Sequence, residues 1–344
     1  MSRVKSAGEK RWFTPVADPS KALKIAGIHT QDANPFFTTR PYKGVIDFGK
    51  GKAITWPFRA QSIDATMFWG TADADAVTRE LAGTGMNPVA VKGSDGVVKP
   101  LMQAWYLHYN DTSLSTENDP KRQYKEFLAF LTVANQPTNP LPYTNGFSTT
   151  LGVTVPGAKV FQLSLLLDNK LATQAGRDTA GMDKQFAPQI TEANTKAGTG
   201  NQLKVRILDA AGDRLVNIAA NVDPAKMNAE IEDILKAYGF TDPSQLASLP
   251  KESAFEIVNK DVRGGKALVQ WNMASSTVVG GMVMHSAGTA DRIQVVGKSD
   301  LGLQLKQLKF TPQIVGATSG MMGSYEVQGL DQLAAKLAAE SSGR

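Results

Sequence analysis

The side chain with the clearest chemical potential in this sequence is a lysine that follows a strongly apolar segment. Residues 160–167 read VFQLSLLL, with the alternation of a strand, and Lys184 lies seventeen residues beyond their end. An unprotonated lysine amine attacks a ketone, and the resulting iminium draws electrons from the neighbouring carbon. Because lysine ordinarily titrates near ~10.4, this role requires apolar walls that lower its pKa. The other interpretation, an ordinary surface lysine between Asp183 and Gln185, stays open on spacing alone.

A carboxylate on an apolar strand is the second candidate. Residues 124–133 read YKEFLAFLTV, and alternation places Glu126 on the same face as Tyr124 and Leu128. A carboxyl group in apolar surroundings has a raised pKa and can carry a proton near neutral pH. A structural role for Glu126 fits the same spacing equally well.

The composition leaves few other nucleophiles or metal ligands. The 344 residues include no cysteine and only three histidines, the closest two being His29 and His108, 79 residues apart. Disulfides, thiolate nucleophiles, zinc fingers and iron–sulfur ligation are therefore excluded, as are HxH and HExxH metal motifs. The sequence also contains no GxSxG and no GxxxxGK[ST] motif. We expect neither a metal nor another cofactor.

Several segments, taken in order, resemble the acetoacetate decarboxylase superfamily. Its members carry an apolar strand ending in a Leu-Asp turn, then Gly-Arg-Glu, then Pro-Lys-Lys, whose first lysine forms a Schiff base. Here Leu167-Asp168, Gly176-Arg177-Asp178 and Asp183-Lys184-Gln185 take those places, and residues 124–126 resemble the family's Tyr-x-Glu, which supplies a carboxylate. The resemblance covers roughly residues 41–327. It implies that Lys184 is the imine-forming lysine and that Glu126 moves a proton.

The sequence departs from the family pattern at three positions. Trp105 stands where the decarboxylases have a second acid, Asp183 replaces the proline and Gln185 replaces the second lysine. The imine-forming part is therefore retained, while the surroundings that favour decarboxylation are altered. Some members of the superfamily use the same lysine for aldol, dehydration or cyclisation chemistry on oxo acids, so both outcomes stay open.

Five residues are candidates for binding the substrate. Trp105 would form an apolar wall, and Met182 and Gln185 flank the lysine in sequence. Arg59 precedes a strand that lines the family's site and would hold a carboxylate. His108 shares an alternating strand with this site and would line the same cavity. The plainer interpretations are a surface arginine for Arg59 and a hydrogen-bonded core histidine for His108.

Together these features predict a Schiff-base-forming lyase that acts on a small-molecule oxo acid, by decarboxylation or by aldolase or dehydratase chemistry. The alternative is a non-catalytic protein that binds a small molecule on the same barrel with a degenerate site, which the residues at 105, 183 and 185 favour. A hydrolase that uses other residues is a third possibility. Because members of the family form multimers, we expect a homo-oligomer.

The charge pattern bears on partners and location. Lysine and arginine total 37 against 32 aspartate and glutamate, a net charge of +5, and no run of five like charges occurs. The clustered cations with interleaved aromatic residues that bind nucleic acid are missing. No apolar stretch approaches the ~18 residues of a membrane-spanning helix, and the first residues lack the apolar core of a signal peptide. We expect no nucleic-acid partner, no membrane association and a cytoplasmic location.

Mostly short strands must position these side chains. Alternating apolar residues between Gly, Asn, Asp and Pro predict an α+β fold of mostly antiparallel strands, and the resemblance implies a β-barrel or cone with a few peripheral helices. In residues 160–167, alternation predicts one face made of Phe161, Leu163, Leu165 and Leu167. The expected strands are residues 65–69, 101–109, 127–133, 160–167, 203–208, 215–219, 267–271, 278–284, 293–296 and 301–310.

Helices and irregular segments follow from capping residues and turn formers. Apolar stripes with caps predict helices over residues 73–81, 224–238 and 330–340. Turn formers predict a long loop or decorated hairpin over 135–158 and a polar turn over 191–202.

The expected domain organisation is simple. Residues 1–40 form an irregular lead-in, and residues 41–330 form one domain with a helical insertion near 223–250. Residues 331–344 form a C-terminal helix or tail.

Overall fold

The computed structural model describes residues 12–15, 35–40, 43–49, 52–92, 96–115, 123–142, 157–197, 200–221, 252–262, 268–276 and 282–327. The helices expected at 224–238 and 330–340 lie outside these residues, as do most of the insertion near 223–250 and the tail at 331–344. Within the described part of the chain, no helix combines the length and the apolar character needed to cross a membrane.

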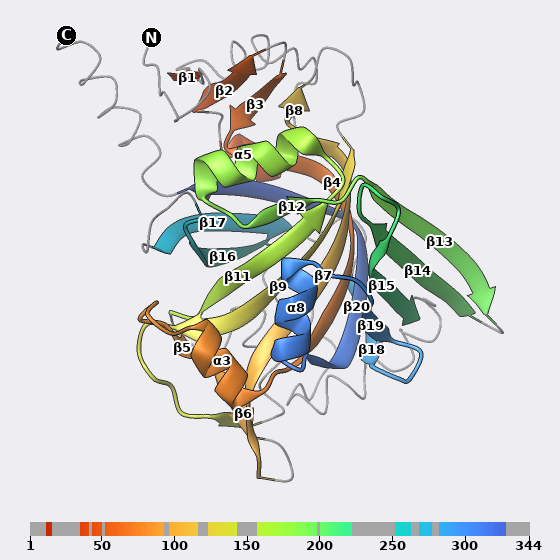
Figure 1. Ribbon diagram of the computed structural model, residues 1–344. Coiled ribbons are helices and arrows are strands. Elements are labelled where there is room, and N and C mark those ends of the chain that lie inside the picture. The colour runs from red at the N-terminus through yellow and green to blue at the C-terminus, as the bar shows by residue number, and fades with distance from the viewer. Residues whose placement is uncertain are drawn as a thin grey trace.

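One large sheet dominates the fold (Figure 1). Its long strands pair in the order β7–β4–β20–β17–β16–β11–β9, and β9 pairs again with β7. Every pair in this series is antiparallel except β11 with β16. The strands are β4 (Phe58–Thr71), β7 (Val98–Thr112), β9 (Tyr124–Ala134), β11 (Lys159–Leu167), β16 (Glu252–Lys260), β17 (Leu268–Ser276) and β20 (Thr311–Val327).

Short strands extend the large sheet, and two smaller sheets lie against it. The short strands are β5 (Asn87–Pro88), β6 (Ala90–Lys92), β10 (Leu141–Pro142), β12 (Lys184–Phe186) and β18 (Met282–Ser286). The first small sheet holds β1 (Trp12–Pro15), β2 (Gly44–Gly49), β3 (Lys52–Trp56) and β8 (Leu114–Ser115). The second holds β13 (Gln189–Ala197), β14 (Gly200–Leu208), β15 (Arg214–Asn221) and β19 (Arg292–Val295).

The helices of the described residues are few and peripheral. They are α2 (Pro35–Thr38), α3 (Ala74–Glu80), α5 (Lys170–Ala180) and α8 (Asp300–Gln307). Figure 1 shows α5 crossing the end of β11 beneath the first small sheet, and α8 lying in front of the large sheet. The expected helix at 73–81 is confirmed as α3, and Asp73 caps it by accepting the N–H of Ala76 at 3.0 Å.

Both faces of the large sheet are buried, which explains its nearly continuous apolar strands. In β9, Leu128 and Phe130 belong to an inner cluster, while Phe127, Ala129 and Leu131 belong to an outer one. The outer cluster packs against α3, α8 and the second small sheet. The inner cluster surrounds the candidate site described below.

The expectation of mostly antiparallel strands with few helices is confirmed. Nine of the ten expected segments contain a strand in their described residues; position 267 and residues 278–281 lie outside the described part of the chain. Within residues 1–40, expected to be irregular, β1 pairs with β2 and α2 forms one turn of helix.

The strand expected at 301–310 is wrong, because α8 occupies most of it. Alternating leucines at 301, 303 and 305 mimic a strand, but Ser299 caps a helix by accepting the N–H of Gly302 at 3.1 Å. Leu301, Leu305 and Leu308 are then spaced for one helical face and are buried, whereas Leu303 is 45% exposed.

The polar turn expected at 191–202 is also wrong. Strands β13 and β14 pair antiparallel from Gln189 with Leu208 to Ala197 with Gly200, so only residues 198–199 remain between them. Thr191, Lys204 and Arg206 are exposed on this hairpin. A strand with one solvated face carries many polar residues, so its sequence resembles that of a turn.

Candidate active site

A tight return of the chain from α5 to β12 positions Lys184. The helix is followed by Gly181, whose φ of +59° lies in the left-handed region that glycine adopts without strain. The N–H of Met182 then donates to the carbonyl of Gly176 at 3.2 Å. Strand β12 begins at Lys184 itself, which pairs in parallel with Leu165 of β11.

An irregularity in β11 turns the strand over beside Lys184. The pairing of β11 with β9 shifts between Gln162 and Leu165. Before the shift, Phe161 and Leu163 pack in the outer cluster; after it, Leu165 and Leu167 pack in the inner one. The predicted single face of these four residues is therefore wrong, because a bulge interrupts the two-residue period.

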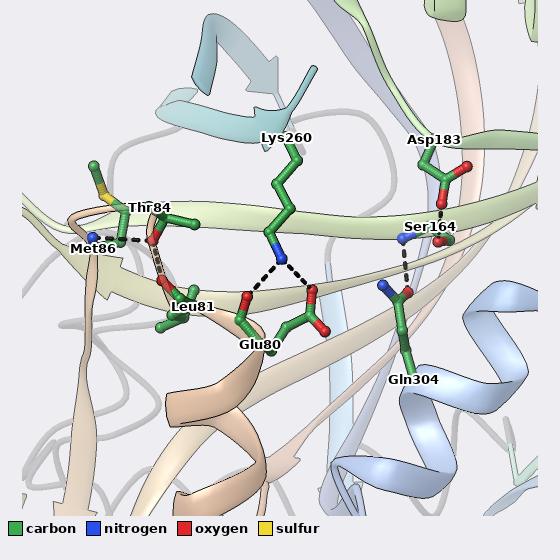
Figure 2. A network of polar contacts seen from close by, with 8 residues as sticks. All are labelled: Glu80, Leu81, Thr84, Met86, Ser164, Asp183, Lys260 and Gln304. Carbon is green, nitrogen blue, oxygen red and sulfur yellow. Dashed lines mark hydrogen bonds and ion pairs between the residues drawn. The ribbon is translucent and has the colours of Figure 1, made fainter. Parts of the chain in front are cut away.

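Polar contacts on the outer side of the sheet hold the segment before Lys184 (Figure 2). The hydroxyl of Ser164 donates to the carboxylate of Asp183, and its N–H donates to the side-chain oxygen of Gln304 at 3.0 Å. Because Gln304 belongs to α8, this helix, the bulge and β12 are tied together. The carboxylate of Asp183 thus accepts its hydrogen bond on the outer side of the sheet, although Asp183 is next to Lys184 in sequence.

Lys184 and Glu126 meet on the face of the large sheet that carries the inner cluster. The amine Nζ of Lys184 lies 3.9 Å from Oε2 of Glu126, and the two side chains are only 9% and 6% exposed. Gly176 of α5 makes room for the lysine, because a Cβ at that position would lie 2.2 Å from Lys184 Cε. The glycine thus leaves the space that the lysine side chain occupies where the helix crosses it.

The cavity around this pair has a volume of about 90 Å³ and mostly apolar walls. Ile46, Ile54 and Leu114 of the first small sheet contribute to one part of it. The remaining wall includes residues of α5 and seven aromatic side chains: Trp56, Phe58, Trp105, Tyr109, Tyr124, Phe130 and Tyr325.

Burial governs the protonation of Glu126. Desolvation raises the pKa of its carboxyl group, and the negative charge of Asp168 adds to this effect. The positive charge of Lys184 and a hydrogen bond from Tyr124 oppose it without cancelling it. Oxygen Oε2 has no hydrogen-bond partner. Glu126 is therefore a carboxyl group that keeps its proton to higher pH than in water and has one oxygen available to a reactant.

Trp105 and Met182, two of the residues predicted to bind the substrate, line the cavity that holds Lys184 and Glu126. The indole N–H of Trp105 donates to the side chain of Gln103 at 3.1 Å. Its ring meets Phe130 edge to face, with 5.4 Å between the ring centres. Trp105 therefore serves as a fixed apolar surface.

Arg59 does not reach the cavity. Its guanidinium donates to the backbone carbonyls of Phe37, at 3.2 Å, and of Arg40, and it lies over the ring of Phe37. The predicted role in holding a substrate carboxylate is replaced by a structural one: this buried arginine fastens the segment around α2 to β4.

Gln185 also points away from the cavity. Its side chain exchanges two hydrogen bonds with Asp300 at the start of α8, one of them from the Asp300 N–H at 3.1 Å. Adjacent strand residues point to opposite faces, so a cavity position for Lys184 sends Gln185 outwards.

His108 lies on the outer face of β7, opposite Leu107 and Tyr109. Its Nδ1 lies 3.1 Å from a carboxylate oxygen of Glu192 in β13, and Lys125 lies 3.2 Å from the same oxygen. Burial alone would raise the pKa of Glu192, but the hydrogen bond from His108 and the charges of His108 and Lys125 lower it to about 2. This cluster fastens the second small sheet to the large one.

Two of the three tyrosines that line the cavity, Tyr109 and Tyr325, were not predicted from the sequence. Tyr109 of β7 stacks on Tyr124 of β9 with ring centres 4.2 Å apart, and its hydroxyl lies 3.2 Å from that of Tyr325 in β20. The alternation that places Trp105 inwards would also have indicated Tyr109. No local signal marks Tyr325, which arrives from the far end of the chain. Among the described residues, no three histidine or acidic side chains gather as metal ligands would.

No family model matches the sequence, and no curated protein matches it. The enduracididine biosynthesis enzyme MppR in complex with pyruvate is similar in structure, with a TM-score of 0.44 and 16% identity over 79% of this chain and 88% of that one. Acetoacetate decarboxylase from Legionella pneumophila gives a TM-score of 0.46 and 10% identity over 79% and 86%. An acetoacetate decarboxylase-like enzyme from Sphingomonas wittichii RW1 gives 0.43 and 9% over 78% and 92%. TM-scores below 0.5 at such identities assign no reaction to this chain.

Proposed function

We propose that this protein is a lyase that forms a Schiff base between Lys184 and a small oxo acid. The observation that carries the proposal is the placement of the Lys184 amine 3.9 Å from Glu126 inside an apolar-walled cavity. A surface lysine is surrounded by water, whereas this one is buried beside a carboxyl group whose pKa burial raises. An amine held in apolar walls beside such a carboxyl group is placed to attack a carbonyl compound that enters the cavity.

The chemistry follows from these two groups. The nitrogen of Lys184 attacks the substrate carbonyl carbon, the oxygen departs as water, and a carbon–nitrogen double bond forms. Breaking a bond to the adjacent carbon then sends its electron pair into the iminium and gives an enamine. The broken bond is to CO₂ in a decarboxylation, to carbon in an aldol cleavage, or to hydrogen in an exchange or dehydration. Glu126 donates or accepts the proton at that carbon.

The walls restrict the substrate. Among the described residues that line the cavity, Lys184 is the only cation. The guanidinium of Arg59 is bound elsewhere and does not supply a second one. A second carboxylate on the substrate would lack a partner there, and burial without a partner is costly. We therefore favour a compact oxo acid with one carboxylate and an apolar body that fits against Trp105 and Phe130.

The same proposal includes a cone-shaped barrel with the site inside. Its support is the pairing of β9 with β7, which returns the strand order to its starting point. An inner apolar cluster distinct from the outer one is what a closed sheet around a cavity requires.

Borohydride reduction tests the imine. Wild-type protein incubated with pyruvate, acetoacetate or 4-phenyl-2-oxobutanoate and then reduced should gain the mass of one adduct. The Lys184→Gln variant should gain none. Lys170→Gln is the matched control, since Lys170 is an exposed lysine at the start of α5, and it should behave like wild type.

The outcomes separate catalysis from simple binding. Adduct formation with release of CO₂ assigns a decarboxylase, and adduct formation without it assigns aldolase or dehydratase chemistry. If the wild-type protein binds these compounds by calorimetry but never forms an adduct, the chain is a small-molecule-binding protein and the proposal is wrong. An adduct that persists in Lys184→Gln would also contradict it.

A further inference from the structure

We propose that Tyr124, Tyr109 and Tyr325 form a proton relay between Glu126 and the outer part of the cavity wall. The inference rests on the proposed function, in which Glu126 exchanges protons with the substrate. It assigns a role to three phenols from three different strands that neither imine formation nor packing alone requires.

The geometry places the hydroxyl groups in series. Tyr109 and Tyr124 are directly paired across β7 and β9, and their rings are nearly parallel, with an interplanar angle of 15°. Tyr124 and Glu126 lie two residues apart on β9 and both line the cavity, and the side chain of Tyr124 interacts with those of Glu126 and Tyr109. The Tyr109 hydroxyl then contacts that of Tyr325 at 3.2 Å. Tyr124 and Tyr109 thus each have a neighbour on both sides, and Tyr325 ends the series.

Burial makes these phenols carriers of protons rather than bases. Tyr109 and Tyr124 are 3% and 4% exposed, and desolvation raises the pKa of each well above its usual value, with neighbouring phenols and Glu126 adding to the effect. An ionised phenolate is therefore unfavourable along the chain. A neutral hydroxyl can still accept one proton while it releases another.

The outer end of the series is its least buried member, since Tyr325 is half-buried whereas Tyr109 and Tyr124 are buried. Tyr325 is followed by Glu326, which lines the cavity, and whose 32% exposed side chain pairs with Lys43. Glu126, in contrast, is almost completely buried. A proton that Glu126 takes from a substrate would otherwise return to the substrate or move to Lys184.

The step balances without another reactant. When the iminium loses an α-proton, the carbon–hydrogen electron pair enters the new enamine and the proton binds Glu126. The hydroxyl groups first turn so that each donates outwards; Glu126 then passes a proton to Tyr124 as Tyr124 releases its own to Tyr109, Tyr109 to Tyr325, and Tyr325 to water. Every phenol ends neutral, and the direction of each hydrogen bond is reversed.

The first test follows α-hydrogen exchange of butan-2-one in D₂O by NMR. Tyr109→Phe interrupts the series in the middle, and Tyr325→Phe removes its outer end. Both should slow exchange at least tenfold while borohydride trapping on Lys184 continues at the wild-type rate, because proton transfer contributes ~10²–10⁴-fold in favourable cases. Tyr106→Phe is the matched control, a buried tyrosine of the same strand that packs in the outer cluster, and it should leave exchange unchanged.

The second test does not depend on an imine. After rapid mixing with D₂O at a pH where Glu126 is protonated, the infrared band of its carboxyl group, identified by its loss in Glu126→Gln, reports deuteration directly. Deuteration should be at least tenfold slower in Tyr109→Phe than in wild type or Tyr106→Phe. Equal rates in all three proteins would overturn the relay. A slowed rate in a protein that never traps a carbonyl compound would leave the relay standing and refute the Schiff-base proposal instead.

Discussion

Gly176→Ala should change the reactivity of Lys184 without lowering the stability of the fold. Gly176 lies within α5, where alanine is the better helix former by ~1 kcal/mol. The added Cβ would meet Lys184 at 2.2 Å from Cε, 2.6 Å from Cδ and 3.0 Å from Nζ. Every short contact is thus with one flexible side chain, and none is with backbone.

The expected magnitudes follow from these distances. Ordinary carbon–carbon contacts begin near ~3.4 Å, so the end of Lys184 must move by roughly 1 Å or more. Because the lysine can move, the fold should keep its stability or gain up to ~1 kcal/mol, which is about 2 °C in Tm for a chain of this size. A misplacement of ~1 Å costs on the order of 10²-fold in rate, or ~2.7 kcal/mol in activation free energy.

Two measurements on one protein preparation test this reasoning. Thermal unfolding should show an unchanged or slightly raised Tm for Gly176→Ala, and borohydride trapping should slow about 100-fold. Lys170→Gly changes helix propensity in the same helix at an exposed position, and it should trap at the wild-type rate. Wild-type trapping by Gly176→Ala would refute the assignment of Lys184, and a collapse in Tm would refute the inference that the lysine side chain moves to accommodate the added Cβ.

Three further outcomes are expected. Because burial raises the pKa of Glu126, α-proton exchange that needs its carboxylate should fall as pH decreases through a midpoint above 4.5, and a midpoint at or below 4.5 would contradict the assignment. Glu192 has a lowered pKa of about 2, so the stability that its ionised form contributes is present above pH 4.5 and is lost as pH falls through 2. At ~1.4 kcal/mol for each pKa unit, Glu192→Gln should lower the free energy of unfolding at pH 7 by up to ~3 kcal/mol. The difference from wild type should narrow in acid. Gly181→Ala puts a side chain at φ +59° and a Cβ 2.4 Å from Asp261 Oδ1, and should cost at least ~1–2 kcal/mol in denaturant unfolding, whereas an unchanged midpoint would show that the turn relaxes freely.

The inward direction of Glu126 could be predicted because β9 alternates without interruption. Tyr124, Glu126, Leu128 and Phe130 all line the cavity, as a two-residue period requires. The same period on β11 predicted the wrong face for part of the strand, because the bulge between Gln162 and Leu165 cannot be detected from local alternation.

The position of Lys184 depends on a helix that the residue pattern conceals. Asn169 reads as a turn former, yet it caps α5 by accepting the N–H of Ala172 at 2.9 Å. Thr173, Gly176 and Thr179 are poor helix formers, so propensity argues against a helix that packing nevertheless stabilises. The resemblance in motif order located the lysine where physical patterns did not.

The residues that proved not to line the cavity have partners far away in the sequence. Arg59 binds the carbonyls of residues 37 and 40, Gln185 binds Asp300, and His108 approaches Glu192. Sequence spacing shows which face of a strand a side chain occupies. Its hydrogen-bond or ion-pair partner, however, depends on tertiary contacts with residues far away in the sequence.

A crystal structure of the protein after borohydride reduction with its best-trapped oxo acid tests the central claim most directly. We expect continuous density from Nζ of Lys184 to the substrate carbon, with the body of the adduct against Trp105 and with Oε2 of Glu126 facing the adjacent carbon. An adduct on a different lysine, or an unmodified Lys184 beside an empty cavity in protein that carries the adduct mass, would contradict it.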